Sequence, residues 1–272
     1  MEFPDTENLL RLLLIEKNLS PELRGAINDK AKNLLKGLTF DVSYFLHDEL
    51  DEEKHSEDDI RTLVQCIPSA LSCKKYNSDV LTFEEDDCDG MHVFPIQSVC
   101  YRKQYSFLPV LAEEGIKHNV DGDEMRGGLL CEHSLEKSAL WTLSCCGGLV
   151  EDSRCLDVIK RLREMGLFEK EDIQKYDLLL GSCFDYSSKR FNYFADWDPS
   201  LLKESLTFDK TQLLLNLLAK LCLYFGDKFQ LALGATLRHY PHELGLLLLK
   251  NPKGDTAFKT ARAKYGKMKL GE

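Results

Sequence analysis

Three short stretches of the chain carry residue types that could do chemistry, and the first contains the acids of a calcium loop. With Gly90 in the sixth place of such a loop, Glu85, Asp87 and Asp89 fall in the first, third and fifth places. The twelfth place then holds Ile96, whereas a calcium loop needs a glutamate that binds the ion through both oxygens. The sequence therefore predicts an acidic loop here and no calcium site.

Histidines and cysteines give no stronger chemical pattern. Of the seven histidines only His239 and His242 lie close together, and no cysteine or acid completes the ligand spacing of a zinc site. His239 is expected to end a helix, where it would favour the last carbonyls. Cys145 and Cys146 have no basic neighbour to lower a thiol pKa, so they are typical of a helix end. The sequence thus predicts no catalytic residue, no metal, no cofactor and a protein that is not an enzyme.

The composition narrows the possible partners. The chain has 272 residues, 43% of them hydrophobic and 29% charged, with a net charge of −10. This charge argues against a nucleic-acid partner bound through a broad basic surface. No apolar run reaches the roughly 18 residues of a membrane span, and the first residues lack the basic start of a secretory signal. An intracellular protein, cytoplasmic or nuclear, is expected, with its ten cysteines acting as small buried hydrophobes.

The elements that would position any site begin with two predicted helices. Residues 5–17 are rich in leucine, and 20–37 open with Ser20, Pro21 and Glu22, a good helix start. We favour an end-cap for residues 1–46, the alternative being a separate adaptor module such as a degenerate F-box. Eight acids between Asp48 and Asp59 indicate a solvated linker or, alternatively, an acidic docking strip. The predicted domains are a helical cap with its acidic linker, 1–56, and a repeat array, 57–272.

Internal repetition is the main signal in the rest of the chain. Three amphipathic stretches end on an x-Pro-x-x-Leu phrase, at 67–71, 198–202 and 240–244, where the proline stops a helix. Two others end at Gly115 and Gly166, which are expected to be left-handed C-caps.

Shorter apolar helices are predicted before these stretches, at 94–99, 138–143 and 177–182, with a fainter one at 211–216. Long loops such as 74–90 and 119–128 connect them.

The last repeat, 251–261, is the clearest. Gly254 suits a tight turn, and Asp255 or Thr256 can cap the helix that follows. Phe258 and Ala261 fall on one face of that helix and are expected to be buried against residues 229–237. The basic residues of the same helix, Lys259 and Arg262 among them, would then face water.

This unit resembles the turn and Thr-Pro-Leu-His-x-Ala helix of an ankyrin repeat, although Ala257 replaces the proline and Lys259 the histidine. Phrases at 94–97, 126–130 and 264–267 are similar to the lineage-expanded ankyrin-like families of unicellular algae. The residues that carry the resemblance, all expected to be structural, are Pro95, Ile96, Ser138, Leu140, Gly254, Thr256, Phe258 and Ala261.

The resemblance implies an all-α fold, an irregular ankyrin-like α-solenoid of stacked helix pairs with long connecting loops. It implies a non-catalytic scaffold that binds another protein, of unknown identity, through a concave face and loop tips. Two alternatives remain open. An adaptor would recruit other machinery through an exposed apolar groove in residues 1–46, and an enzyme on a divergent helical-repeat fold would collect acids, histidine or cysteine in a deep pocket.

Overall fold

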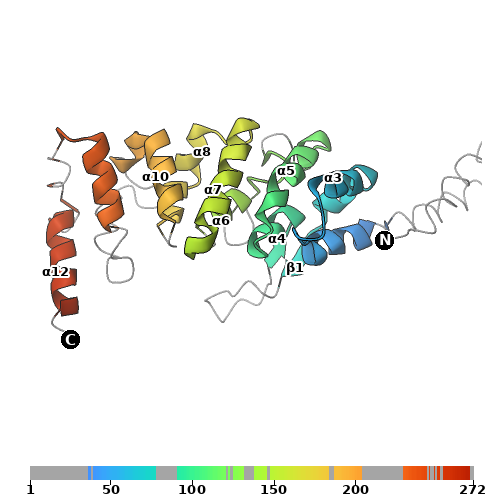
Figure 1. Ribbon diagram of the computed structural model, residues 1–272, viewed down its shortest axis with the longest axis horizontal. Helices are drawn as coiled ribbons and strands as arrows, with labels where there is room; N and C mark the ends of the chain where they lie inside the picture. The colour runs from blue at the N-terminus through green and yellow to red at the C-terminus, as the bar shows by residue number, and fades with distance from the viewer. Residues whose placement is uncertain are drawn as a thin grey trace, which may run out of the picture.

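The computed structural model describes residues 36–37, 39–77, 91–120, 122, 125–131, 138–145, 148–183, 187–203, 229–243, 245, 248, 250–251 and 254–269. These residues are mainly helical, and their elements follow one another along the long axis of the molecule (Figure 1). A short antiparallel hairpin joins β1 (Lys75–Asn77) to β2 (Met91–Val93), with Lys75 opposite Val93. The predicted helical fold class is confirmed at this level.

Successive elements form two rows. In the short-helix row, each element contacts the next in the order η2 (Phe45–Glu49), α4 (Pro95–Tyr101), α6 (Ala139–Cys145) and α9 (Leu178–Gly181). In the long-helix row, the order is α3 (Glu57–Cys66), α5 (Leu108–Lys117), α7 (Gly148–Glu164) and α10 (Ser188–Trp197). The remaining elements are η3 (Pro68–Ser72), η4 (Tyr105–Phe107), α8 (Lys170–Lys175), η6 (Pro199–Leu202), a helix at 229–239 and α12 (Ala257–Lys269).

Two helices of the short-helix row, α4 and α6, are buried on almost all sides. Every α4 residue from Pro95 to Cys100 is buried, and in α6 only Trp141 is partly exposed. A helix that is hydrophobic on all sides is typical of a core position. The predicted helices at 94–99, 138–143 and 177–182 are thus confirmed as α4, α6 and α9, whereas 211–216 lies outside the described residues.

Proline ends the long helices as predicted. α3 stops at Cys66 before Pro68 opens η3, and α10 stops at Trp197 before Pro199 opens η6. Helix 229–239 stops in the same way, before Pro241. Since proline lacks an N–H and its ring clashes with the preceding turn, the same local chemistry produces the same architecture at these places.

The two predicted glycine caps have different outcomes. Gly166 has φ +71°, and the Leu167 N–H donates to the Leu162 carbonyl at 2.9 Å, which closes α7 as predicted. Gly115, in contrast, lies inside α5, so the prediction of a cap is wrong there. A Cβ on Gly115 would come within 2.5 Å of the Gly127 carbonyl oxygen. Glycine is required at this position because the backbone of a loop crosses the helix.

The acidic run lies beside the hydrophobic core, although Glu49, Glu53, Asp58 and Asp59 are exposed. Leu50 and Ile60, inside and just after it, are both 1% exposed and belong to the hydrophobic core. Ser56 and Asp59 form a reciprocal capping box at the start of α3. The predicted helices at 5–17 and 20–35, and the acidic loop at 85–90, lie outside the described residues. The division of the chain at residue 56 and the choice between cap and adaptor stay predictions.

Candidate interaction surface

The residues that carry the ankyrin resemblance in the first units lie inside the protein. Pro95 opens α4, and Ile96 and Leu140 are 4% and 0% exposed. Ser138 is buried, and its Oγ accepts a hydrogen bond from the Trp141 N–H at 3.1 Å, which caps α6. These side chains position helices and do not face a partner.

In the last unit, 251–261, the helix buries a different face from the one predicted. Gly254 has φ +79°, and the Thr256 Oγ1 accepts the Lys259 N–H at 3.2 Å, so the turn and cap are as expected. Ala261 is 3% exposed, but Phe258 is 49% exposed and contacts Phe229 only edge-on, at a centroid distance of 6.1 Å. The buried position one turn before Ala261 is Ala257, which at 3% exposure takes the place predicted for Phe258.

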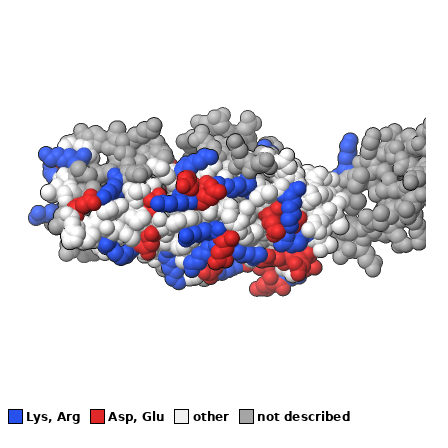
Figure 2. All heavy atoms as spheres, turned by 90° about the horizontal axis from the view of Figure 1, so that it is seen from above, with Lys and Arg blue, Asp and Glu red and all other residues white. Residues whose placement is uncertain are grey.

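Because the short helices are buried, the long-helix row supplies much of the described surface. Figure 2 shows basic and acidic side chains interspersed over one face of the molecule, with acids gathered toward the N-terminal end. Mixed charges of this kind can pair between neighbouring helices. The ion pairs described below connect the long helices in this way.

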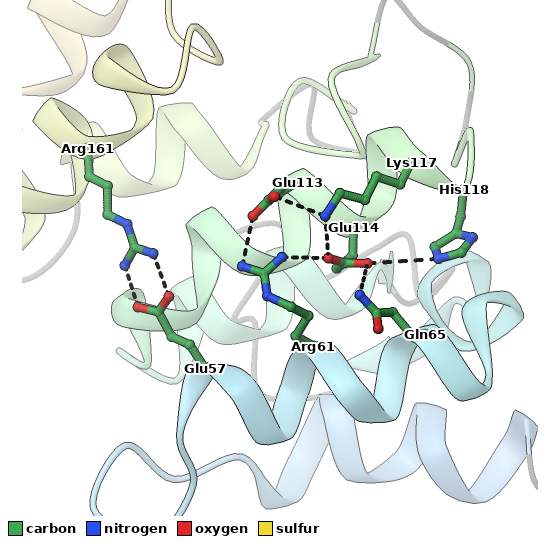
Figure 3. A network of polar contacts seen from close by, with 8 residues as sticks. All are labelled: Glu57, Arg61, Gln65, Glu113, Glu114, Lys117, His118 and Arg161. Carbon is green, nitrogen blue, oxygen red and sulfur yellow. Dashed lines mark hydrogen bonds and ion pairs between the residues drawn. The ribbon is translucent and has the colours of Figure 1, made fainter.

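Glu114 of α5 is the centre of the first such contact (Figure 3). Its carboxylate is 1% exposed and accepts bonds from Arg61 at 2.6 Å and Lys117 at 2.8 Å. Gln65 donates to its second oxygen at 3.4 Å, and His118 lies 3.9 Å from that oxygen. Burial by itself raises the pKa of Glu114, but the hydrogen bonds from Lys117, Arg61 and Gln65 together hold its pKa below the usual range.

The same network extends to the helices on both sides. The Glu113 carboxylate forms ion pairs with Arg61 at 2.8 Å and with Lys117 at 2.9 Å. Glu57 of α3 forms a bidentate ion pair with Arg161 of α7 (Figure 3). Arginine–carboxylate pairs, which have a specific geometry, therefore connect α3 with both α5 and α7. The network explains how α3, α5 and α7 keep their alignment.

A more deeply buried pair connects α7 with α10. The Asp152 Oδ1 accepts from Arg190 Nε at 2.9 Å, and the side chains are 4% and 0% exposed. Asp152 also accepts the Lys189 N–H at 2.8 Å, so it caps α10 from a neighbouring helix. Arg190 Nη1 donates to the Leu143 carbonyl at 2.5 Å, which adds α6 to the contact.

The Arg-Gly-Gly-Leu-Leu phrase at 126–130 makes another such connection. Arg126 has φ 46°, and its side chain pairs with Asp172 and, at 2.8 Å, with Glu169. It also donates to the Leu167 carbonyl at 3.1 Å. The phrase therefore joins the turn after α5 to the segment after α7.

One surface cluster differs from these pairs, and we call it the Arg163 platform: Arg163 of α7, Tyr193 and Trp197 of α10, and Phe168 beneath them. The Arg163 guanidinium stacks 3.9 Å from the Trp197 ring centroid and donates to the Tyr193 hydroxyl at 3.1 Å. Phe168, 2% exposed, supports Trp197 edge-on at 4.9 Å. Tyr193 and Trp197 are partly exposed, and Arg163 is exposed.

Paired charges border the platform. Lys170 lies 3.2 Å from Asp198, and Asp196 accepts from Arg238 at 3.1 Å. His239 ends helix 229–239 as expected, and its Nε2 lies 2.7 Å from the same Asp196 oxygen. Burial opposes ionisation of Asp196, but the bonds from His239 and Arg238 lower its pKa overall.

Sequence reasoning missed most of these contacts. Glu114, Asp152, Arg163 and Arg190 gave no local signal, because each has a partner in a helix that is distant in the sequence.

No family model, curated protein or solved structure matches the chain. In the described part of the chain, no helix has the length and apolar character needed to cross a membrane. The same residues include no cluster of three or more histidine, cysteine, aspartate or glutamate side chains able to hold a metal.

Proposed function

We propose that the chain is an irregular ankyrin-like repeat array that works as a non-catalytic scaffold for binding another protein. The two rows of helices support the array: each short apolar helix is followed by a longer amphipathic one, and like elements stack on like. Helix pairs of this size cannot bury their apolar faces alone, so neighbours must supply the core.

The observation that carries the binding function is the Arg163 platform. Tryptophan, tyrosine and arginine are the residues most enriched at the energetic centres of protein interfaces. Here they lie together at the α7–α10 junction, and a buried phenylalanine holds the tryptophan in place. An aromatic surface that is already rigid loses little side-chain entropy when a partner binds.

The site proposed here differs from the concave face that the family resemblance implies. Residues of α4, α6 and α9 are buried nearly throughout, so in the described part of the chain the outer sides of the long helices offer more side-chain surface. We therefore place the partner on the long-helix row.

Affinity capture with the full chain, followed by cross-linking and mass spectrometry, tests the proposal. We expect one or a few proteins whose cross-links map to lysines near the platform, Lys170 and Lys189 among them. Trp197→Ala should abolish their capture, whereas Phe258→Ala, which removes an exposed aromatic far along the chain, should not. Equal loss in both variants, or capture insensitive to both, would exclude the platform as the binding site.

A further inference from the structure

The Arg163 guanidinium lacks the acid that other arginines of the long-helix row possess. Arg61, Arg154, Arg161 and Arg190 each form an ion pair with an aspartate or glutamate. Arg163 forms none with any residue that the structure describes, and its one side-chain hydrogen bond with a described residue goes to a neutral hydroxyl.

The position of this cation is nevertheless fixed. Stacking on Trp197 at 3.9 Å and the bond to Tyr193 hold the guanidinium plane in one orientation. A guanidinium has five N–H donors, and among the described residues only Nη1 of Arg163 donates a side-chain hydrogen bond. The others form an edge that matches the two oxygens of a carboxylate.

The charges around the platform indicate how many negative charges a bound group should carry. Lys170 is matched by Asp198, and Arg238 by Asp196, whereas the Arg163 guanidinium has no acid partner among the described residues. A single guanidinium balances the one negative charge of a carboxylate. One negative charge fits this site better than the two of a phosphate.

We infer that the platform binds a protein segment that presents an aspartate or glutamate to Arg163 and an apolar side chain to Tyr193 and Trp197. The inference rests on the proposed scaffold function and names the chemistry of its partner. The carboxylate would supply the bidentate pair that Arg163 lacks, on an aromatic surface that excludes water and strengthens it.

The experiment begins with selection of phage-displayed peptides on the full chain. We expect the selected peptides to share an acid next to an aromatic or aliphatic residue. A synthetic peptide is then made with its acid and with the matching amide, and both are titrated calorimetrically against wild type and Arg163→Gln. In wild type the amide peptide should bind roughly tenfold or more weakly. In Arg163→Gln the acid and amide peptides should bind alike, since the two changes remove the same contact.

Matched variants separate this contact from general electrostatics. Lys160→Gln removes one exposed charge from the same helix and should preserve the preference for the acid. Arg163→Lys keeps the charge but loses the planar fork and the stacking, and should lose most of the preference. Thermal unfolding of each variant reports whether the fold is intact.

Several outcomes would overturn the inference. Peptides that bind wild type and Arg163→Gln with the same acid preference would place the carboxylate elsewhere, and the scaffold function would stand. A phosphoserine peptide that binds more than about tenfold tighter than its glutamate counterpart would favour a phosphate ligand. Failure to select any peptide would count against both the inference and the scaffold function.

Discussion

Between α7 and α10 the contact is made by a buried carboxylate and a buried guanidinium, whereas helix 229–239 and α12 bury mainly alanines, together with Phe229 and Thr236. Asp152 and Arg190 are 3% and 0% exposed, and Ala232, Ala235, Ala257 and Ala261 are 0–3% exposed. Two larger apolar residues of these helices are exposed to a substantial degree, Leu237 at 39% and Phe258 at 49%, whereas Phe229 is 5% exposed.

The comparison distinguishes two ways in which neighbouring helices are held together. A buried ion pair fixes alignment, and removing one partner leaves an uncompensated charge. Small apolar residues allow helices to approach closely, yet each buries little surface. The centre of the array should therefore respond to mutation much more strongly than its C-terminal end, and the following predictions test this difference.

The largest effect is expected for Asp152→Ala. The change leaves the Arg190 guanidinium buried without its carboxylate and removes the cap on the Lys189 N–H. A loss of about 3–5 kcal/mol in the free energy of unfolding is expected. Urea denaturation of the full chain measures it. Glu151→Ala is the control, because it removes only a partly exposed pair with Arg154, and should change the stability by less than about 1 kcal/mol. Equal losses would contradict the difference between buried and surface pairs.

A smaller, pH-dependent effect is expected for Glu114. Its pKa in the folded protein lies below the usual 4.5. The carboxylate thus contributes stability that is fully present above that value and lost as the pH falls through the folded pKa. Glu114→Gln should lower the stability at pH 7 by about 1–3 kcal/mol.

Below pH 4.5 the free energy of unfolding of the same variant should depend less on pH than that of wild type. Unfolding measured at intervals from neutral to acidic pH checks both statements. A variant that is equally stable at pH 7, or equally sensitive to acid, would show that the network does not hold α3 against α5.

His47, near the N-terminal end of the described residues, should make the stability depend on pH in a range closer to neutral. Its ring lies between the Ser98 hydroxyl at 2.6 Å and the Cys73 carbonyl at 3.0 Å. Burial lowers its pKa below the usual 6.5, although the Cys73 bond and Asp48 oppose the shift. The neutral ring therefore stabilises the fold above pH 6.5, and this contribution declines as the pH falls.

Hydrogen exchange checks this prediction. Corrected for intrinsic rates, protection of residues 42–50 should fall between pH 7 and pH 5 more than protection of α7 does. His47→Gln should remove the pH dependence. A uniform loss of protection along the chain would exclude a local contribution from His47.

The smallest effect is expected for Phe258→Ala. The side chain is half exposed and contributes an edge-on contact with Phe229, typically about 0.5–1.5 kcal/mol. Lys259→Ala, on the exposed face, should change stability by less than about 0.5 kcal/mol. Hydrogen exchange should show faster opening of 229–265 in Phe258→Ala with α3 to α7 unchanged. A loss as large as that of Asp152→Ala would mean that Phe258 is buried after all.

Local chemistry allowed the sequence alone to predict where the helices start and stop. Pro68, Pro199 and Pro241 end long helices, Ser138 caps a short one, and Gly166 takes a left-handed conformation. Each of these effects acts over a few residues of chain, so no knowledge of neighbouring repeats was needed. The apolar runs at 94–99, 138–143 and 177–182 likewise predicted the short helices.

Contacts between distant residues were decided only by the tertiary structure. Asp152 and Arg190 are 38 residues apart, and Arg61 and Glu114 are 53 apart, so no spacing rule joins them. Gly115 was expected to cap a helix because it follows an amphipathic stretch, but the loop that crosses it allows no side chain. Periodicity put Phe258 and Ala261 on a common face. The packing of α12 instead buried Ala257 with Ala261, because which side of a helix is covered depends on the shape of its neighbour.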